Sequence, residues 1–210
     1  MSQLLSLDSP LMKLLARMVD MVMLNTLFLI CCIPIITLGA SLTSLYYVLL
    51  KMVRGEDLAI VSSFFRAFQR NFKQSTIVWV FLLVLNIILL VNAFSLGIHD
   101  GLLKVFYMGM LLFLGTLSLS VFLFIFPYIA RFQDTIKQSL INSVMISWFH
   151  MRYFFLLLVM NVLPVILVLF SVKWLIIVVY FVTFGGIALI VWLNAHILNK
   201  IFAVYEKRTA

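Results

Sequence analysis

Long apolar runs, separated by short charged stretches, dominate the pattern of the chain. Asp, Glu, Lys and Arg are absent from five stretches, at residues 21–50, 74–99, 105–130, 153–172 and 174–199. Each stretch reaches the ~20 residues that an α-helix needs to cross ~30 Å of hydrocarbon. The pattern therefore predicts an all-α, polytopic transmembrane helix bundle that forms one integral membrane domain over residues 1–210.

The first apolar stretch contains Pro34 and Gly39, which predict a tight turn over residues 34–39. Proline removes a backbone donor and glycine tolerates unusual backbone angles, so a helix is expected to end here and a second one to begin. We therefore expect about six spans, at residues 10–33, 40–53, 75–96, 102–130, 153–171 and 174–199. Five spans, with residues 21–50 as one broken helix, are the alternative.

Small residues follow this turn at helical spacing. Gly39 pairs with Thr43, and Ala40 pairs with Ser44. Small side chains four residues apart let a second transmembrane helix approach closely. Helix packing is the interpretation that we favour, and a broken helix that binds a substrate is the alternative.

Two polar stretches between spans have the pattern of amphipathic helices, at about residues 60–74 and 134–150. On a helical projection of the first, four aromatic rings share one side and the polar residues Arg66, Gln69, Arg70 and Lys73 lie opposite. Such a helix lies in a membrane surface, with rings in the acyl boundary and cations among the headgroups. The candidate surface for docking lipid or a partner consists of Phe64, Phe65, Arg66, Phe68, Arg70, Phe72 and Lys73. Lipid anchoring alone is the alternative.

The second stretch places an apolar stripe opposite a polar face made of hydroxyl and amide side chains. The stripe consists of Ile136, Leu140, Val144 and Trp148. Each amphipathic stretch leads into a span that contains an asparagine, Asn86 in one and Asn161 in the other. A parallel internal duplication and two unrelated hairpins both explain this arrangement.

Composition and charge add a direction to the bundle. The chain of 210 residues is 65% hydrophobic and 10% charged, which lies outside the range of soluble domains. With six spans and both termini inside, 13 of the 15 Lys and Arg residues are cytoplasmic and only Lys104 and Lys173 are external. Five spans weaken this split to 11 against 4. Because positive residues favour the cytoplasmic side, the net charge of +8 indicates topology and a lipid bilayer as partner, and nucleic acid is not expected.

The candidate polar residues within the membrane are Asp20, Asn25, Asn86, Asn161 and Asn194. Asp20 lies three residues from Arg17, so a local ion pair is expected and a proton relay is the alternative. The asparagines are expected to form hydrogen bonds across helices, and convergence of several on one cavity would indicate a ligand site. Motifs for a metal, for a phosphate-binding loop or for a nucleophilic serine are absent, so we expect no enzyme, no cofactor and no metal.

Three segments together resemble the YesL-like family of bacterial integral membrane proteins, which has no established molecular function. They are residues 32–41 (CIPIITLGAS), 40–51 (ASLTSLYYVLLK) and 64–74 (FFRAFQRNFKQ). The resemblance implies a multi-pass protein of the bacterial plasma membrane, associated with carbohydrate uptake. We therefore expect a non-enzymatic accessory or scaffolding component, with ABC-type sugar transporter subunits as partners. The alternative is a small neutral-solute transporter or channel that acts as a homo-oligomer.

Overall fold

The computed structural model describes residues 10–98 and 101–209, and within them it contains helices and no strands. The α-helices are α1 (Pro10–Cys31), α2 (Leu38–Val53), α3 (Ile60–Phe94), α4 (Gly101–Arg131), α5 (Ile136–Phe149), α6 (Met151–Phe170), α7 (Val172–Phe181) and α8 (Ile187–Thr209). Short helical turns join them at η1 (Ile35–Thr37), η2 (Ser95–Ile98) and η3 (Val182–Gly186). The predicted all-α class is confirmed.

Five helical segments of the described chain are long and apolar enough to cross a membrane. They are Ile35–Val53, Ile60–Gly97, Gly101–Arg131, Met151–Leu169 and Val172–Glu206. The protein is therefore a multi-pass membrane protein, and five is the smaller of the two counts that the sequence left open. Residues 21–50 are not one broken span, however, because α1 ends at Cys31 and α2 begins at Leu38, as the Pro34–Gly39 turn predicts.

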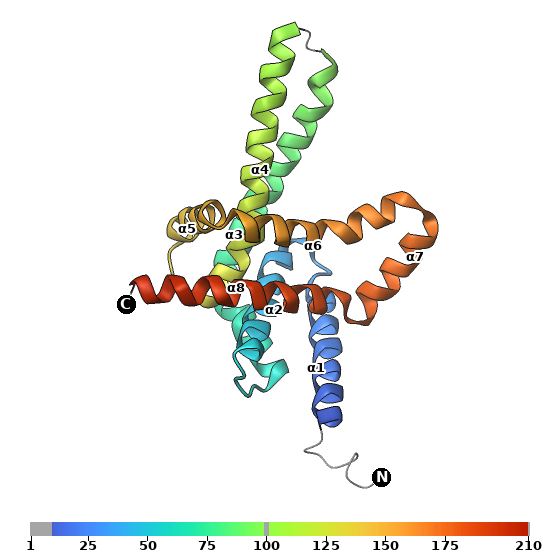
Figure 1. The fold of residues 1–210 in the computed structure, drawn as a ribbon, viewed down its shortest axis with the longest axis vertical. Coiled ribbons are helices and arrows are strands. Elements are labelled where there is room, and N and C mark those ends of the chain that lie inside the picture. The colour runs from blue at the N-terminus through green and yellow to red at the C-terminus, as the bar shows by residue number, and fades with distance from the viewer. Residues whose placement is uncertain (1–9, 99–100, 210) are drawn as a thin grey trace.

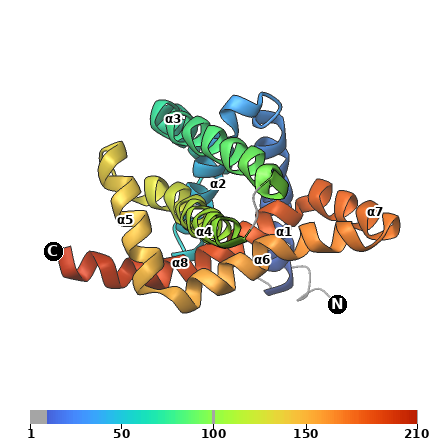
Figure 2. The same cartoon turned by 90° about the horizontal axis from the view of Figure 1, so that it is seen from above.

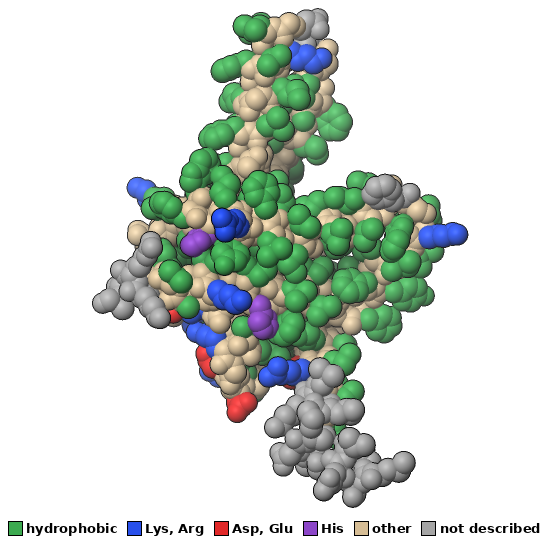
Figure 3. Space-filling model, in the orientation of Figure 1, with side chains coloured by type: hydrophobic (Ala, Val, Ile, Leu, Met, Phe, Trp, Pro, Cys, Tyr) green, Lys and Arg blue, Asp and Glu red, His purple; other side chains and the backbone are tan. Residues whose placement is uncertain are grey.

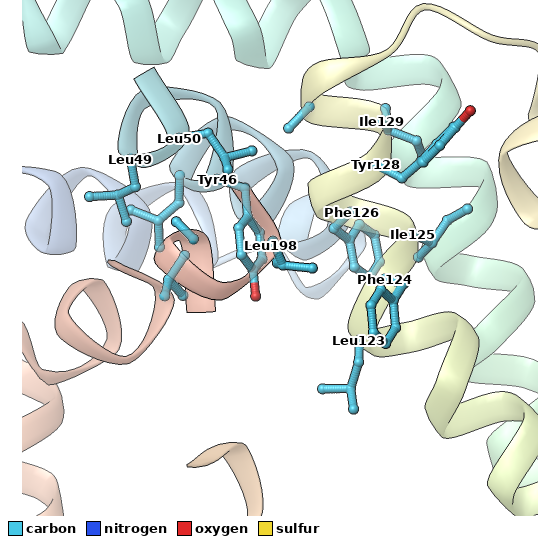
Figure 4. Packing of buried hydrophobic residues seen from close by; sticks show 14 of the residues in the cluster. Tyr46, Leu49, Leu50, Leu123, Phe124, Ile125, Phe126, Tyr128, Ile129 and Leu198 are labelled. Atoms are coloured by element: carbon cyan, nitrogen blue, oxygen red, sulfur yellow. The ribbon is translucent and has the colours of Figure 1, made fainter. Parts of the chain in front are cut away.

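Helix α2 forms the centre of the molecule, with α1, α3, α4 and α8 packed around it. Its buried residues include Gly39, Ala40, Ser41, Thr43 and Ser44 in its first half. Figure 4 shows part of its second half, where Leu198 of α8 lies between Tyr46 and Phe126 of α4. Small residues bring backbones together, and van der Waals packing is the main source of helix association in lipid.

The contact between α2 and α3 is the closest in the core. A Cβ placed on Gly39 would lie 2.6 Å from both the carbonyl oxygen of Ser75 and Cβ of Trp79. The hydroxyl of Thr43 lies 2.8 Å from that of Ser75, and the Trp79 indole N–H donates to the carbonyl of Ile35 at 2.8 Å. The predicted role of Gly39 and Thr43 in close helix packing is thus observed, with α3 as the partner.

Helix α3 runs without a break for 35 residues, from Ile60 to Phe94. The sequence pattern predicts two elements here, a surface helix at 60–74 and a span at 75–96. The structure joins them because no glycine or proline lies between residues 60 and 94, so nothing interrupts the backbone hydrogen bonds.

Two helical hairpins extend from the core as arms in different directions (Figures 1 and 2). We call them the α3–α4 arm (residues 83–98 and 101–117) and the α6–α7 arm (residues 158–181). Lys104 lies in the first turn of α4 and Lys173 in the first turn of α7, so each marks the tip of one arm. Most other Lys, Arg, Asp and Glu side chains on the face in Figure 3 gather around the opposite end, which we call the charged base.

Helix α5 has its polar side turned inward. Its buried residues are Ser139, Asn142, Ser143, Ile146 and Ser147. Its exposed apolar residues are Ile141, Met145, Trp148 and Phe149. The expected stripe is thus only partly on the outer face: Trp148 is exposed, whereas Ile136, Leu140 and Val144 are half-buried. An apolar exterior around a polar interior is the arrangement of a helix that contacts lipid or an apolar partner.

Candidate functional site in the helix core

The helix after α7 is broken inside an apolar segment, at η3. Phe184 has non-helical angles of φ −92° and ψ 19°, and Gly185 follows with φ +117°. The second angle is accessible to glycine and strained for other residues. A Cβ on Gly186 would lie 2.3 Å from the ring of Phe181, so this second glycine is needed for packing.

The side chain of Asn25 bonds to the backbone on both sides of this break. Its amide nitrogen donates to the carbonyls of Val182, at 2.8 Å, and Thr183, at 3.2 Å. Its amide oxygen accepts from the backbone N–H of Ala188 at 3.2 Å. A break at membrane depth leaves backbone groups without helical partners, and Asn25, which is fully buried, supplies them.

A second polar cluster joins α2, α6 and α8. The amide nitrogen of Asn194 lies 3.4 Å from both the Tyr46 hydroxyl and the Asn161 amide oxygen. Asn161 in turn donates to the carbonyl of Leu157 at 2.7 Å. The amide oxygen of Asn194 is buried and has no hydrogen-bond partner among the described residues. An unpaired buried acceptor is costly, so this oxygen is available to a donor that comes close to it.

A cavity of about 270 Å³ lies beside both clusters. Tyr46 and Asn161 line it as its polar residues, and Val182, whose carbonyl Asn25 binds, lines it next to the helix break. The remaining wall is apolar and comes from α1, α2, α4, α6 and α8. The cavity is thus an apolar chamber with one hydroxyl and one carboxamide, groups that bind uncharged polar molecules.

Two of the predicted polar residues lie elsewhere. Asn86 donates to the Ser118 hydroxyl at 2.8 Å and joins α3 to α4 at the base of their arm. Asp20 and Arg17 line a shallow pocket with Glu56 and Asp57 at the charged base, and no ion pair joins Asp20 to Arg17. The local ion pair expected from their spacing is therefore not formed. Asn25, Asn161 and Asn194 are the predicted residues that the core brings together.

The predicted docking residues lie in the first half of α3, with one difference. Arg66, Arg70 and Lys73 are exposed, as are Phe65 and Phe72, and Phe68 is half-buried. Phe64 is fully buried in the core, so the four rings do not share one lipid-facing side. The rings still contact one another, with centroids 6.5 Å apart for Phe64 and Phe68 and 5.4 Å apart for Phe68 and Phe72.

A hydrogen-bonded link holds the two predicted surface helices together. The amide nitrogen of Gln74, in α3, donates to the carbonyl of Asp134 at 3.0 Å and to the Ser139 hydroxyl of α5 at 3.2 Å. In the middle of α5, the Asn142 amide donates to the Tyr128 hydroxyl of α4 at 2.7 Å. Gln74 thus joins the end of the segment 60–74 to the start of the segment 134–150.

Sequence reasoning missed the broken helix and the role of Tyr46. The adjacent glycines Gly185 and Gly186 are the signal that indicates the break, because two glycines inside an apolar helix weaken it. Nothing local marks Tyr46, since its partner Asn194 is 148 residues away.

Comparison with known proteins adds a family and no activity. The family described as "Protein of unknown function, DUF624" matches residues 21–93. YesL-like proteins are in this family, so the resemblance is confirmed over that segment. The match covers about a third of the chain, from α1 through α3, and includes Asn25 and Tyr46 but not Asn161 or Asn194. A search of the curated proteins and a search of the solved structures found no match.

Proposed function

We propose, starting from a family match that carries no assigned activity, that this multi-pass membrane protein is a non-enzymatic accessory or scaffolding component of carbohydrate uptake in the bacterial plasma membrane. Its partners under this proposal are subunits of an ABC-type sugar transporter. The supporting observation is the link through Gln74 between the first half of α3 and the start of α5, whose exposed side chains we take together as the docking surface. The association with carbohydrate uptake comes from the YesL-like resemblance.

The chemistry of this surface suits a partner that is itself at the membrane. The α3 part exposes two aromatic rings beside cations, with Phe65 and Phe72 near Arg66 and Lys73. The α5 part exposes the four apolar side chains of Ile141, Met145, Trp148 and Phe149. Aromatic residues and arginine are the types most enriched where proteins bind one another. We therefore place the docking of a partner on this surface.

Charge reversal on α3 tests this proposal. The variant Arg66→Glu/Lys73→Glu reverses two exposed charges and leaves the buried contacts of α3 intact. We expect affinity-tagged full-length protein, purified from membranes of its own bacterium, to recover sugar-transporter subunits at least tenfold less than the wild type does. Quantitative mass spectrometry of the purified material measures the recovery.

A matched control separates docking from total charge. Lys104→Glu/Lys173→Glu makes the same change in net charge at the tips of the two arms, and recovery should stay within twofold of the wild type. If wild-type protein recovers no transporter subunits, the accessory function is wrong. Equal losses in the two double variants would argue against a docking role for α3.

A second candidate function is transport of a small neutral solute, with the protein acting as a homo-oligomer. The observation that favours it is the cavity of about 270 Å³ lined by Tyr46 and Asn161, beside the unpaired amide oxygen of Asn194. Hydroxyl and carboxamide groups pair with the hydroxyls of an uncharged polyol or sugar. The broken helix at η3 adds a second feature common in transporters, where discontinuous helices form substrate sites.

A further inference from the structure

A small basic pocket opens at the charged base, where the ends of α2, α4 and α8 meet the side of α3. Its volume is about 150 Å³, and its polar wall is formed by Tyr47, Lys51, Arg54, Arg70, Arg131, Gln133 and Glu206. This pocket is separate from the core cavity and uses neither Arg66 nor Lys73. The arrangement of its charges shows what it can bind.

Arg131 and Glu206 form a fixed, mutually neutral part of the wall. The guanidinium donates to both carboxylate oxygens of Glu206, at 2.8 and 2.9 Å, and to the amide oxygen of Asn199 at 2.7 Å. Its side chain is only 7% exposed, and the ring of Phe202 lies 5.6 Å from its guanidinium carbon. A bidentate pair of this kind holds one geometry and anchors the end of α8 to the end of α4.

The opposite wall has more cations than carboxylates. Lys51 and Arg54 share a single carboxylate, that of Glu56, at 3.1 and 3.0 Å. One carboxylate therefore balances two cations on this side of the pocket. Lys51 is held in the last turn of α2, and Arg54 is the residue that caps that helix, so both positions are set by the core.

Arg70 adds a further positive charge. Its guanidinium carbon lies 5.1 Å from the centre of the Tyr47 ring, and the ammonium of Lys51 lies 5.0 Å from the same ring. Arg70 forms no ion pair with any residue that the structure describes. Cation–π contact with one ring thus keeps two like charges near each other without neutralising either. Four cations face two carboxylates here, an excess of two positive charges.

We propose that this pocket binds a phosphate group. A phosphate carries the charge that the pocket leaves unbalanced, and arginine and lysine are the side chains that recognise it best. The volume is below the ~300–1,000 Å³ typical of pockets for drug-sized ligands, so a single phosphate group suits it better than a whole nucleotide. The phosphate can belong to a lipid headgroup, since the pocket lies where four helices leave the apolar segments, or to a soluble phosphate compound.

Two binding measurements on the full-length protein distinguish these sources. In the first, the protein is held in nanodiscs of phosphatidylcholine and titrated calorimetrically with inorganic phosphate and, separately, with glycerol 3-phosphate. In the second, it is purified in detergent and supplied with equal amounts of phosphatidylglycerol and phosphatidylcholine, and native mass spectrometry measures which lipid it retains. Saturable binding in the first indicates a soluble phosphate, and preferential retention of phosphatidylglycerol in the second indicates a headgroup.

Variants assign the binding to this pocket. Arg70→Gln removes the unpaired cation from an exposed position, and we expect about tenfold weaker binding in whichever measurement is positive, because a charge-assisted hydrogen bond is lost. Arg54→Gln should give a similar loss from another helix. Lys200→Gln removes an exposed charge from α8 outside the pocket and should change binding less than twofold. Thermal unfolding of each variant verifies its fold.

The results decide the proposal in either direction. A loss in Arg70→Gln and Arg54→Gln that Lys200→Gln does not share supports the pocket. No binding by the wild type in either measurement overturns it. Binding that both pocket variants leave unchanged, or that Lys200→Gln weakens equally, also overturns it, because the anion is then attracted by the general positive charge of the base.

Discussion

At the scale of single residues, close helix contact is the property that the sequence predicted best. The spacing of Gly39 and Thr43 predicts that another helix packs closely against them. That helix is α3, whose Ser75 contacts both residues. The pattern did not identify α3 as the partner, because a stripe of small residues indicates that a neighbouring helix packs closely but does not indicate which helix it is.

Adding one methyl group at Gly39 should therefore destabilise the protein. In Gly39→Ala the new Cβ would lie 2.6 Å from backbone and side-chain atoms of α3, which must move apart. We expect a loss of about 1–3 kcal/mol in the free energy of unfolding, as for other overpacked cores. Reversible unfolding in mixed micelles measures it. Gly109→Ala is the control, since outside its own turn of helix no described atom lies within 4 Å of its added Cβ, and an equal loss there would contradict this account.

The limits of the sequence are also clearest in single residues. Phe64 and Phe65 are neighbours of the same type, yet Phe64 is 0% exposed and Phe65 is 42% exposed. A helical projection placed both rings toward lipid. Lipid and protein core are equally apolar, so in a membrane protein an apolar stripe does not reveal which of the two it faces.

At the scale of helices and turns, the break between α7 and α8 depends on a residue far away in sequence. Gly185 and Gly186 allow the backbone to turn, and Asn25 holds the turned backbone by three hydrogen bonds across about 160 residues. The Pro34–Gly39 turn was predicted because its cause is local. The hydrogen bonds between Asn25 and the backbone at η3 were not predicted, because an asparagine in a span has many conceivable partners.

Removing the Asn25 amide should weaken the last hairpin. Asn25→Ala leaves the carbonyls of Val182 and Thr183 and the N–H of Ala188 without this partner in a buried place. We expect a loss of about 1–3 kcal/mol in the free energy of unfolding and faster amide exchange at residues 182–188. Hydrogen exchange with mass spectrometry locates the change. The control variant is Asn92→Ala, at the distal part of the α3–α4 arm, which should leave amide exchange at residues 182–188 unaltered. Faster exchange at residues 182–188 in this control as well would indicate a general loosening of the protein.

At the scale of the whole molecule, composition was enough to predict a polytopic helix bundle. The two lysines that the charge pattern predicts to be external, Lys104 and Lys173, lie at the tips of the arms. The divergence of the arms was not predictable (Figure 1). It arises from packing around α2, which depends on contacts among all the helices. The contact between Asn161, which lines the cavity, and Asn194 follows from that packing as well, and Asn86, with a similar place in the sequence pattern, takes no part in it.

The second candidate function makes a prediction at this scale. If the cavity admits a neutral solute, wild-type protein in proteoliposomes should take up labelled glycerol or a monosaccharide faster than empty vesicles do. Asn161→Ala/Asn194→Ala should reduce that flux at least tenfold, because the cavity loses the carboxamide that lines it and the amide of Asn194 that contacts Asn161. Asn86→Ala, on the other arm, should reduce it less than twofold. Wild-type flux no greater than that of empty vesicles would exclude this function.

The unbroken course of α3 has a mechanical consequence. A helix of 35 residues is about 52 Å long, so α3 is a rigid lever whose lower end carries Arg66 and Arg70 and whose upper end reaches the tip of an arm. Tilting such a lever by about 5° about its lower end displaces the far end by about 4–5 Å, which follows from that length. A tilt of α3 at the charged base would therefore move the tip of the α3–α4 arm with no change of backbone conformation inside the helix. A single element of secondary structure connects these two ends of the molecule.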